Sequence, residues 1–555
     1  MLALFMLTAG TMLQAKVLPG WIPTQGRSLT QKYPDIITET DNVTILKGLA
    51  SGNWVYFKPT APIQAVKGNS IEITLKISSC KGKIFVGFFE YSQGFFKGGI
   101  GAQLKPLKEI SAPEEVKLSI PVKGDKTTIV RPQITLASGS KLTLTSLTCK
   151  VTGKPAPKYK AEAKADHADF VYKCGETAKF TLSATKDGQE IKEGKVVISF
   201  RKNGLLAGYK SFDLNKDPAS FEMTMDKPGF AVASMMLYEN GTPVIRSLQI
   251  GAAVFEPEKI RAGKEAPADL LDYWKNEYAK LNKEVPPEFK LMKSGATAAH
   301  LRYKLTCRNF GDTPTYASIT IPKGKGPFPM IFTVPPAGNY GYGFFSTPKT
   351  IHVTITVFDR LFPTNDDYMK FNRPVWYFHQ GAQKRETYYY YKAILGMMRV
   401  MDYAMTQIKE WDGKHLMAIG RSQGGGSAII MAALNPKIQA LAADVPALCD
   451  HNARLNGRRP GWPQILDQKT TAKSFATDAE YFDAANFASF VKCPAVLSVG
   501  FYDTMCEPSS VYSAYNNLKG PKKMIHCPRY GHGWGKRDTA FDNEVIKIRS
   551  ETFMK

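Results

Sequence analysis

The chain has 555 residues, of which 43% are hydrophobic and 22% are charged, and its formal net charge is +24. This length exceeds what a single hydrophobic core supports and corresponds to three or four domains of about 150 residues each. The positive charge is spread along the chain, without an arginine-rich block or a recognisable nucleic-acid module, so we expect no nucleic-acid partner.

The first residues, MLALFMLTAGTMLQAK, combine an apolar run with a small residue, Ala15, just before Lys16. This pattern predicts a signal peptide over residues 1–15 and therefore an exported protein, secreted or periplasmic. The basic n-region is missing, which leaves a truncated start or a buried apolar N-terminus as alternatives. No other apolar run approaches the length of about 20 residues that a membrane helix needs, so we expect no transmembrane segment.

Residues 18–153 contain short alternating stretches, such as SIEITLKISSC and KLTLTSLTCKV, separated by turns that carry glycine and proline. This pattern predicts a β-sandwich similar to carbohydrate-binding accessory domains. Trp54 and the run GFFEYSQGFF are candidates for stacking on sugar rings, although core packing is the commoner role of such aromatics. Cys80 and Cys149 are candidates for a disulfide between neighbouring strands, which spacing alone does not establish.

A linker rich in lysine and proline, TGKPAPKYKAEAKADHADF, leads into a second strand-rich segment. Its length, near 95 residues, and its turns ATKDG and YENGT are typical of an immunoglobulin-like β-sandwich. We therefore predict a second sandwich domain over residues 160–255.

From residue 265 to 555 the pattern changes to apolar runs that alternate with long amphipathic helices. The predicted strands are PMIFTVPPAG, IHVTITVFD, HLMAIG, ALAADVP, AVLSVG and KMIHCP. Alternation of this kind indicates a parallel sheet with crossover helices. The C-terminal half is therefore predicted to be an α/β domain, and the most informative pattern lies within it.

The stretch Gly420-Arg421-Ser422-Gln423-Gly424 has the G-x-S-x-G spacing of a nucleophile elbow. The predicted strand HLMAIG leads directly into it, and GGGSAIIMAALNP leaves it as a helix. Glycine at both flanking positions gives the backbone room to fold sharply, because a Cβ there would clash. This strand–turn–helix context predicts that Ser422 is a nucleophile, presented at the end of a strand.

A serine hydroxyl needs a histidine base within hydrogen-bonding reach at neutral pH, and in this architecture the histidine comes last in the chain. Only three of the eight histidines follow Ser422, and they are His451, His526 and His532. His526 lies inside the predicted strand KMIHCP, whereas His532 lies in the loop after it. The topology therefore selects His532.

The acid that orients the histidine should follow a strand between the serine and the histidine. Asp503 comes directly after the predicted strand AVLSVG, at the strand end where α/β sites assemble. Asp444 and Asp450 are alternatives, for which packing or shaping of the pocket is the preferred role. We predict Asp503 as the third member of the triad.

Two backbone N–H groups are needed to stabilise the oxyanion of an acyl transfer. One is expected from Gln423, the residue after the nucleophile, and the other from the loop VPPAGNYGYG. Asn339 is the preferred donor in that loop, with Tyr340 as the alternative and as a substrate-binding candidate.

The C-terminal region resembles the acetyl xylan esterases and cephalosporin C deacetylases, carbohydrate esterase family seven. The stretches that carry this resemblance are PADLLDYWKNEYAKLNKEVP, RETYYYYKAILGMMRVMDYA, GRSQGGGSAIIMAALNPKIQALAADVPALCD and SVGFYDTMCEPSSVYSAYNNLKGPKKMIHCPRYGHGW. It implies an α/β-hydrolase fold in which Ser422, Asp503 and His532 form the triad. It implies no metal ion and no organic cofactor.

The chain departs from the family pattern near the pocket. HQGAQ stands where the family has R-G-Q, so only Gln383 matches, AGN replaces H-G-Y before the oxyanion loop, and a glycine replaces the glutamate after His532. A further stretch, RLNGRRPGWPQILDQ, is expected to pass over the site. Arg454, Arg458 and Arg459 in it could contact an acidic sugar and Trp462 could stack on one, while a solvated linking loop is the alternative.

These observations predict a secreted serine esterase that removes acetyl groups from a polysaccharide or oligosaccharide of the xylan type through an acyl-enzyme. The first alternative is an esterase for other acyl groups, such as feruloyl, or a serine peptidase. The second is a glycan-binding protein whose esterase domain is degenerate. Family members often form hexamers, but two N-terminal domains could block that assembly, so the oligomeric state is left open.

Overall fold

The computed structural model describes residues 21–25, 37–40, 43–47, 53–59, 63–65, 68–92, 101–122, 128–153, 157, 159–338, 343–362, 365–373, 375–466, 478–533 and 536–553. The predicted signal peptide lies outside these residues and stays a prediction. The chain divides into two compact units, one formed by Met1–Lys158 with Pro363–Asp366 and the other by Tyr159–Phe362 with Asp367–Lys555.

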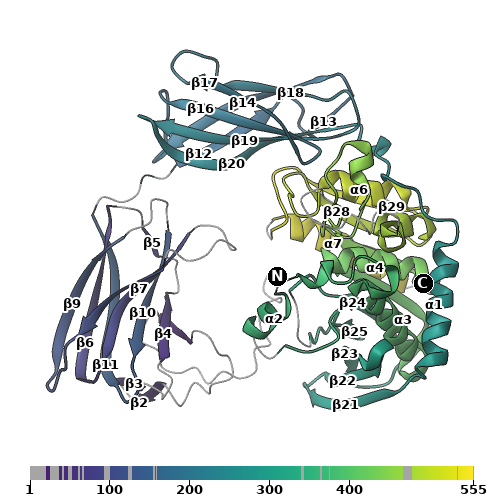
Figure 1. Ribbon diagram of the computed structural model, residues 1–555, viewed down its shortest axis with the longest axis horizontal. Helices are drawn as coiled ribbons and strands as arrows, with labels where there is room; N and C mark the ends of the chain where they lie inside the picture. The colour runs from purple at the N-terminus through teal and green to yellow at the C-terminus, as the bar shows by residue number, and fades with distance from the viewer. Residues whose placement is uncertain are drawn as a thin grey trace. The chain divides into compact units, whose positions relative to one another are not determined.

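The first unit is built from two antiparallel sheets (Figure 1). One sheet has the order β1-β4-β10-β7-β8, with β5 paired to β10, and the other has the order β2-β3-β11-β6-β9. Their bounds are β1 Trp21–Gln25, β2 Ile37–Thr40, β3 Val43–Lys47, β4 Asn53–Pro59, β5 Ile63–Ala65, β6 Ser70–Lys81, β7 Ile84–Ser92, β8 Gly101–Leu107, β9 Glu114–Pro121, β10 Thr128–Leu136 and β11 Lys141–Thr152.

The pleat of these strands explains the shared core of the first unit. Along β6, the buried residues Ile71, Ile73, Leu75 and Ile77 alternate with more exposed ones, as one buried sheet face requires. They belong to one core with residues of the other sheet, such as Phe88. The side chain of Trp54 and most of the GFFEYSQGFF run lie outside the described residues, so their sugar-binding role stays a prediction.

Cys80 and Cys149, the candidates for a disulfide that spacing alone did not establish, are not bridged. Both cysteines are free thiols, on the paired strands β6 and β11, but Cys80 lies opposite Leu142 and Cys149 lies opposite Ile73. The extended strand between Ile73 and Cys80 separates the two sites by roughly 24 Å, at about 3.4 Å per residue, whereas a disulfide needs Cα atoms within about 7 Å.

Residues 159–255 also form two sheets, and both contribute to one core. The first has the order β12-β14-β15 with β18 on β14, and the second has the order β13-β20-β19-β16-β17. Their bounds are β12 Tyr159–Ala165, β13 Val171–Tyr172, β14 Thr177–Lys186, β15 Gln189–Glu190, β16 Lys195–Lys202, β17 Leu205–Asp213, β18 Ser220–Thr224, β19 Gly229–Glu239 and β20 Thr242–Phe255.

The second sheet of this segment continues into the core of the α/β region. Phe230 of β19 and Val254 of β20 belong to the same buried cluster as the strands and helices that follow. The Phe230 ring meets Phe501 edge to face, with centroids 5.2 Å apart, and lies 5.7 Å from the ring of Tyr512. Residues 159–255 and the α/β region are therefore joined by a hydrophobic contact.

Phe230→Ala tests this contact. Phe230 is only 2% exposed, so its removal should lower the free energy of unfolding by about 3–5 kcal/mol through lost burial and the cavity left behind. Urea unfolding followed by tryptophan fluorescence would measure the shift. Tyr209→Ala, at a side chain that is 64% exposed in the same sheet, is the control. Equal midpoints for the two variants would contradict the contact.

A nine-stranded sheet organises the α/β region, with the order β21-β22-β23-β25-β24-β26-β27-β28-β29. The bounds are β21 Phe289–Ala296, β22 His300–Arg308, β23 Pro314–Pro322, β24 Phe328–Val334, β25 Ile351–Ile355, β26 Trp411–Arg421, β27 Ala440–Asp444, β28 Ala495–Gly500 and β29 Lys522–Cys527. From β25 to β29 all neighbours are parallel, as the alternation of strands and helices predicts. The antiparallel extension β21-β22-β23 is absent from the predicted strands.

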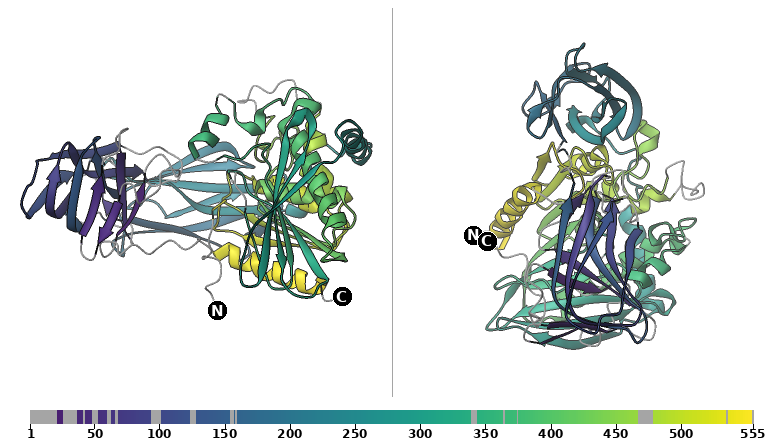
Figure 2. Two further views of the ribbon diagram at one scale, coloured as in Figure 1. Left: turned by 90° about the horizontal axis from the view of Figure 1, so that it is seen from below. Right: turned by 90° about the vertical axis from the view of Figure 1, so that its left-hand side faces the viewer.

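Helices cover both faces of this sheet (Figure 2). Alternate residues of each strand face opposite sides: Met330 and Phe332 of β24 belong to the main core with α1, α3, α4, α5 and α6, whereas Ile331 belongs to a smaller cluster with α7. The bounds are α1 Leu270–Glu284, α2 Asn365–Phe371, α3 Tyr389–Gln407, α4 Gln423–Leu434, α5 Ala484–Phe487, α6 Pro508–Asn517 and α7 Lys536–Phe553. None of the helices among the described residues is long and apolar enough to cross a membrane.

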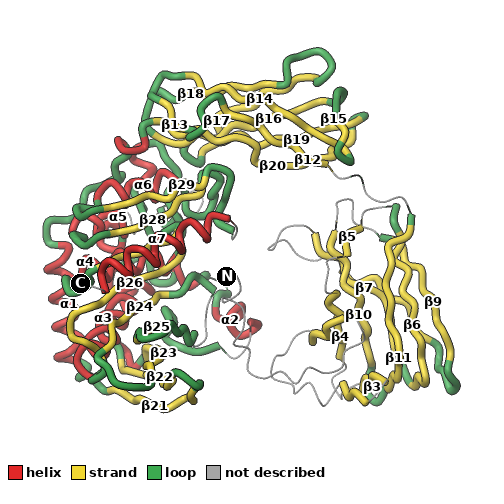
Figure 3. The backbone as a smooth tube through the Cα atoms, turned by 180° about the vertical axis from the view of Figure 1, so that it is seen from behind, coloured by secondary structure: helices red, strands yellow, loops and turns green. Residues whose placement is uncertain are grey.

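Figure 3 shows β24, β26, β28 and β29 within one sheet, and because neighbouring strands there are parallel, their carboxyl ends lie at one edge. Ser422 follows the last residue of β26, Asp503 follows the end of β28, and His532 follows the end of β29. The topology thus brings together three residues of which the first and the last, Ser422 and His532, are 110 positions apart in sequence.

Candidate active site

The backbone at Ser422 is folded into a sharp turn between β26 and α4. Its φ is 54° and its ψ is −121°, a conformation that residues other than glycine rarely adopt. A Cβ on Gly420 would lie 2.1 Å from the carbonyl oxygen of Gly424, and a Cβ on Gly424 would lie 1.9 Å from that of Val334. Both glycines are therefore required by close backbone approach, and the strained turn presents the Ser422 hydroxyl at the strand end.

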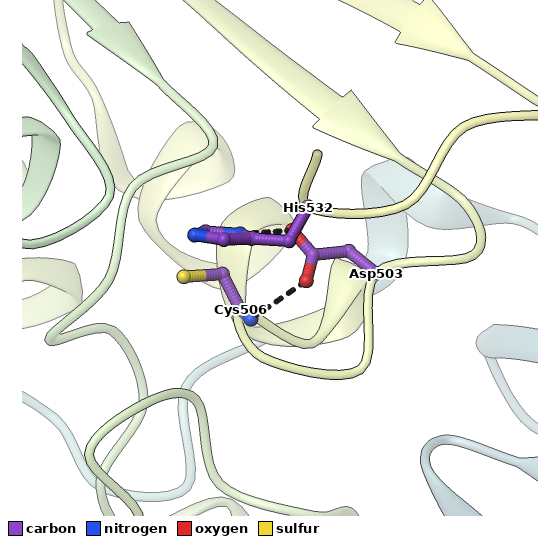
Figure 4. A group of neighbouring side chains, drawn as sticks. All are labelled: Asp503, Cys506 and His532. Atoms are coloured by element: carbon purple, nitrogen blue, oxygen red, sulfur yellow. Dashed lines mark hydrogen bonds and ion pairs between the residues drawn. The ribbon is translucent and has the colours of Figure 1, made fainter. Parts of the chain in front are cut away.

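The three predicted triad residues form one chain of hydrogen bonds. Ser422 Oγ lies 3.0 Å from His532 Nε2, and His532 Nδ1 lies 2.8 Å from Asp503 Oδ2. Asp503 is 2% exposed, and its other oxygen accepts hydrogen bonds from the backbone N–H groups of Met505 and Cys506, each at 2.9 Å. Asp503 is thus held rigidly and leaves a single oxygen for the imidazole (Figure 4).

Gln423, the residue after the serine, is positioned to supply an oxyanion donor. It is the first residue of α4, where a backbone N–H has no acceptor within the helix and the helix dipole favours negative charge. Asn339 and Tyr340, the other predicted contributors, lie outside the described residues. The loop that carries them begins beside the elbow, since the carbonyl oxygens of Val334 and Pro335 face Gly424.

The side chain of Gln423 is fixed by two tyrosines, which the sequence analysis did not single out. Its Oε1 accepts a hydrogen bond from the Tyr390 hydroxyl at 2.7 Å and another from the Tyr377 hydroxyl. Burial raises the pKa of both phenols well above the usual value, so both stay protonated donors. Tyr390 lies within the YYYY run, which could have signalled this role.

Arg421 ties the elbow to the histidine loop, a second role that the sequence analysis missed. Its guanidinium pairs with Asp444 at 3.0 Å and donates a hydrogen bond to the backbone carbonyl of His532 at 2.9 Å. Arg421 and Asp444 lie opposite each other on β26 and β27. The Ser498 hydroxyl donates to the other oxygen of Asp444. Asp444 therefore supports the position of His532 without joining the triad.

Cys506 lies beside the triad, with its Sγ 4.0 Å from Ser422 Oγ. Asp503, Cys506 and His532 present potential metal-ligand atoms within 4.8 Å of one another. Binding a metal would require a thiolate, however, whereas burial raises the pKa of the Cys506 thiol well above its usual value. Both oxygens of Asp503 are also engaged by hydrogen bonds. The donor set fits a hydrogen-bonded triad better than a metal centre.

The loop that carries Asp503 rests against residues 159–255. Gln249 of β20 donates a side-chain hydrogen bond to the carbonyl oxygen of Tyr502 at 2.9 Å. Glu507 pairs with Arg459 at 3.0 Å, and a Cβ on Gly204, in the turn between β16 and β17, would lie 2.7 Å from the Glu507 carboxyl. The second strand-rich segment therefore contacts the loop that carries Asp503.

The carboxyl group of Glu507, at this contact, makes the free energy of unfolding depend on pH. It is 3% exposed, and burial raises its pKa from 4.5 to about 7, although Arg459 acts in the opposite direction. Between these two values the folded protein holds a proton that the unfolded chain has lost, so the free energy of unfolding falls as the pH rises through this window.

Glu507→Gln removes this titration. We expect the stability of the variant relative to the parent protein to rise between pH 4.5 and 7, by at most about 3 kcal/mol. Thermal unfolding of both proteins across this range would measure it. Glu288→Gln, at a side chain that is 71% exposed, is the control, and a difference independent of pH would contradict the assignment.

Two of the predicted substrate-binding residues are held by the protein itself. Arg458 is buried, and its guanidinium pairs with Asp450 at 2.6 Å and also donates to the backbone carbonyl of Arg261. These internal partners give Arg458 a structural role, and its predicted contact with a sugar stays a prediction. Trp462 is half-buried against Phe378, with ring centroids 4.7 Å apart.

Among the described residues, the remaining candidates make no side-chain hydrogen bond to Ser422, Asp503 or His532. Gln383 is exposed in a turn between two short helical segments. His451 is fully buried, and burial lowers its pKa to about 4. His526 Nε2 forms a hydrogen bond with the Tyr512 hydroxyl. His532 is the histidine that meets Ser422, as its place in the loop after β29 predicts.

A family model for acetyl xylan esterases (AXE1) matches residues 254–546, more than half of the chain. The chain belongs to the acetyl xylan esterase family. The family predicted from the sequence is thus confirmed, and the matched residues include the elbow and the loops that carry Asp503 and His532.

Individual acetyl xylan esterases and a related acetyl esterase are similar to this chain. Acetyl esterase Axe7A of Xylanibacter ruminicola is 27% identical over 393 residues, which are 68% of this chain and 87% of that protein. Acetyl xylan esterase 1 of a Thermoanaerobacterium species is 20% identical with a TM-score of 0.46, and acetyl xylan esterase of Paenibacillus sp. R4 is 22% identical with a TM-score of 0.45. Each of these two structures matches 54% of this chain and 98% of its own chain.

Proposed function

We propose that the protein is a serine carbohydrate esterase that removes acetyl groups from xylan-type polysaccharide or oligosaccharide. The observation that supports this most directly is the chain of hydrogen bonds from Ser422 through His532 to Asp503, at 3.0 and 2.8 Å. The acetyl xylan esterase family membership supports the acyl group and the substrate class.

In the proposed reaction, Ser422 Oγ attacks the acetyl carbonyl carbon while His532 Nε2 takes the hydroxyl proton. The negative charge on the carbonyl oxygen is stabilised by the backbone N–H of Gln423 and by a donor from the loop after β24, for which Asn339 remains our candidate. The carbon–oxygen bond to the sugar breaks as His532 returns the proton to the sugar oxygen.

Water completes the turnover. It attacks the acetyl-serine carbonyl while His532 takes its proton, and acetate leaves as that proton returns to Ser422 Oγ. Asp503 orients the imidazole and stabilises its charged form in both steps. No metal ion or organic cofactor takes part in this proposal.

The strand-rich segments 18–153 and 160–255 are proposed to be β-sandwich accessory domains, the first of them sugar-binding. The predicted signal peptide would place the enzyme outside the cytoplasm, where polysaccharides occur. Proteolytic mapping and binding of residues 18–153 to xylan would test this arrangement.

The proposed activity is tested by acetate release from acetylated xylan and acetylated pectin fragments, alongside nitrophenyl esters of increasing acyl length and a feruloyl ester. We expect acetate release from xylan fragments and a preference for the acetyl ester. Faster turnover of feruloyl or long acyl esters would favour the alternative esterase. Tight glycan binding without any turnover would favour a degenerate, sugar-binding domain.

A further inference from the structure

Three aromatic rings, Trp376, Phe378 and Trp462, form a cluster that we call the aromatic platform. The rings of Trp376 and Phe378 are nearly parallel, at 12° with centroids 5.7 Å apart. Trp462 meets Phe378 edge to face at 4.7 Å. Trp376 is 41% exposed, so a large part of its ring faces solvent.

One end of the aromatic platform is attached to the nucleophile. Tyr377, between Trp376 and Phe378 in sequence, is fully buried and donates its hydroxyl hydrogen bond to Gln423. Gln423 follows Ser422 directly. Trp376 and Phe378 therefore flank Tyr377 in sequence. Tyr377 in turn fixes the side chain of Gln423, the residue after Ser422.

The other end is attached to the catalytic acid. The backbone N–H of Trp462 donates to the carbonyl oxygen of Met505 at 3.1 Å, and the backbone N–H of Met505 donates to Asp503 at 2.9 Å. Met505 is itself 47% exposed. Two separate hydrogen-bonded connections thus link the segments that carry the aromatic platform to the elbow and to the Asp503 loop.

The backbone that carries the exposed ring is held firmly. The carbonyl oxygen of Trp376 accepts from the backbone N–H of His379 at 2.8 Å, and that of Val375 accepts from the side-chain amide of Gln380 at 3.0 Å. An exposed tryptophan on an anchored backbone loses little entropy when a ligand stacks on it. Core packing would instead have buried the ring.

We propose that the aromatic platform is a subsite that binds pyranose rings of the polysaccharide chain next to the acetylated residue. The C–H face of a pyranose is apolar and flat, and it matches the exposed face of an indole, whereas its hydroxyl groups stay in water. The uncharged ring surface suits a neutral xylan backbone. This inference rests on the proposed function, because the subsite serves the substrate of the same triad.

Binding of an acetylated xylohexaose to the full chain tests the subsite. The Ser422→Ala background prevents turnover, and isothermal titration calorimetry measures Kd. We expect the additional substitution Trp376→Ala to weaken binding about fivefold or more, and Trp376→Phe to restore most of the affinity. Tyr209→Ala removes an exposed aromatic from β17 and serves as the matched control with unchanged Kd. Equal affinities for the Ala variant and its background would overturn the proposal, as would no binding at all.

Kinetics separate this proposal from the proposed function. In proteins with an intact Ser422, the ratio of kcat/KM on the oligosaccharide to kcat/KM on p-nitrophenyl acetate should fall about fivefold in Trp376→Ala, mainly through KM. An unchanged ratio in an active enzyme would overturn the subsite and leave the esterase intact. A parent protein that hydrolyses neither ester would contradict the esterase, while the calorimetry would still decide the subsite. A selective loss on p-nitrophenyl octanoate would assign the aromatic platform to the acyl chain and overturn our proposal.

Discussion

Ser422→Ala should lower kcat for acetate release by about 10⁴-fold or more. The substitution removes the only hydroxyl that His532 contacts at Nε2 among the described residues. The neighbouring Cys506 thiol is no substitute nucleophile, because burial raises its pKa well above the usual value and keeps it protonated. Acetate release from acetylated xylo-oligosaccharides, measured with an enzyme-coupled acetate assay, gives the readout.

Ser427→Ala is the matched control for this experiment. Ser427 lies one turn further along α4, is fully buried, and has a hydroxyl without a hydrogen-bond partner among the described side chains. We expect this variant to keep kcat within about twofold of the parent. A Ser422→Ala protein that retains more than about 1% of the parent kcat would show that another group performs the attack.

Asp503→Asn should lower kcat by about 10³–10⁴-fold with little change in fold. Asp503 Oδ1 accepts from two backbone N–H groups, so the amide oxygen of an asparagine must take that position. The amide NH₂ then faces His532 Nδ1, which becomes the acceptor, and the proton moves to Nε2. An imidazole with its proton on Nε2 cannot take the proton of Ser422.

Asp412→Asn is a closely matched control, because Asp412 and His415 repeat the same local geometry away from the site. Asp412 Oδ2 lies 2.8 Å from His415 Nδ1, and its Oδ1 accepts from the backbone N–H groups of Lys414 and His415. This pair lies near the start of β26, whereas Ser422 follows its end. Similar losses of kcat in the two variants would contradict the assigned role of Asp503.

Much of the site was predictable from local patterns and chain order. The elbow has a strand, a turn and a helix within one short stretch, so the close approach of Gly420 to Gly424 follows from near neighbours in sequence, whereas that of Gly424 to Val334 does not. The chain order of serine, acid and histidine limited the base to the histidines after Ser422, and the strand ends favoured Asp503 and His532 among the candidates. Because parallel strands have their carboxyl ends at one edge of the sheet, the order of the residues in the chain was enough to predict which of them lie close together.

Predictions that depended on side-chain direction were less successful. Arg458, in a polar stretch with three arginines, resembles a solvent-facing residue, yet it turns inward to pair with Asp450. The strands β21 to β23 escaped prediction because an antiparallel extension follows no helix alternation. The sequence shows that these residues are charged or apolar. It does not show their contact partners, which are set by how the chain folds.

The amino-acid sequence by itself therefore predicted the family, the strand–turn–helix elbow at Ser422 and the order of the three proposed triad residues, because each depends on short-range backbone geometry or on strand succession. Only the tertiary structure decided which groups support that triad. Three sets of contacts join segments separated by 33 to 111 residues. They are the hydrogen bonds of two tyrosines to Gln423, the hydrogen bond of Arg421 to the His532 loop, and the aromatic platform. Such contacts arise from how whole elements pack, and no local pattern in the chain encodes them.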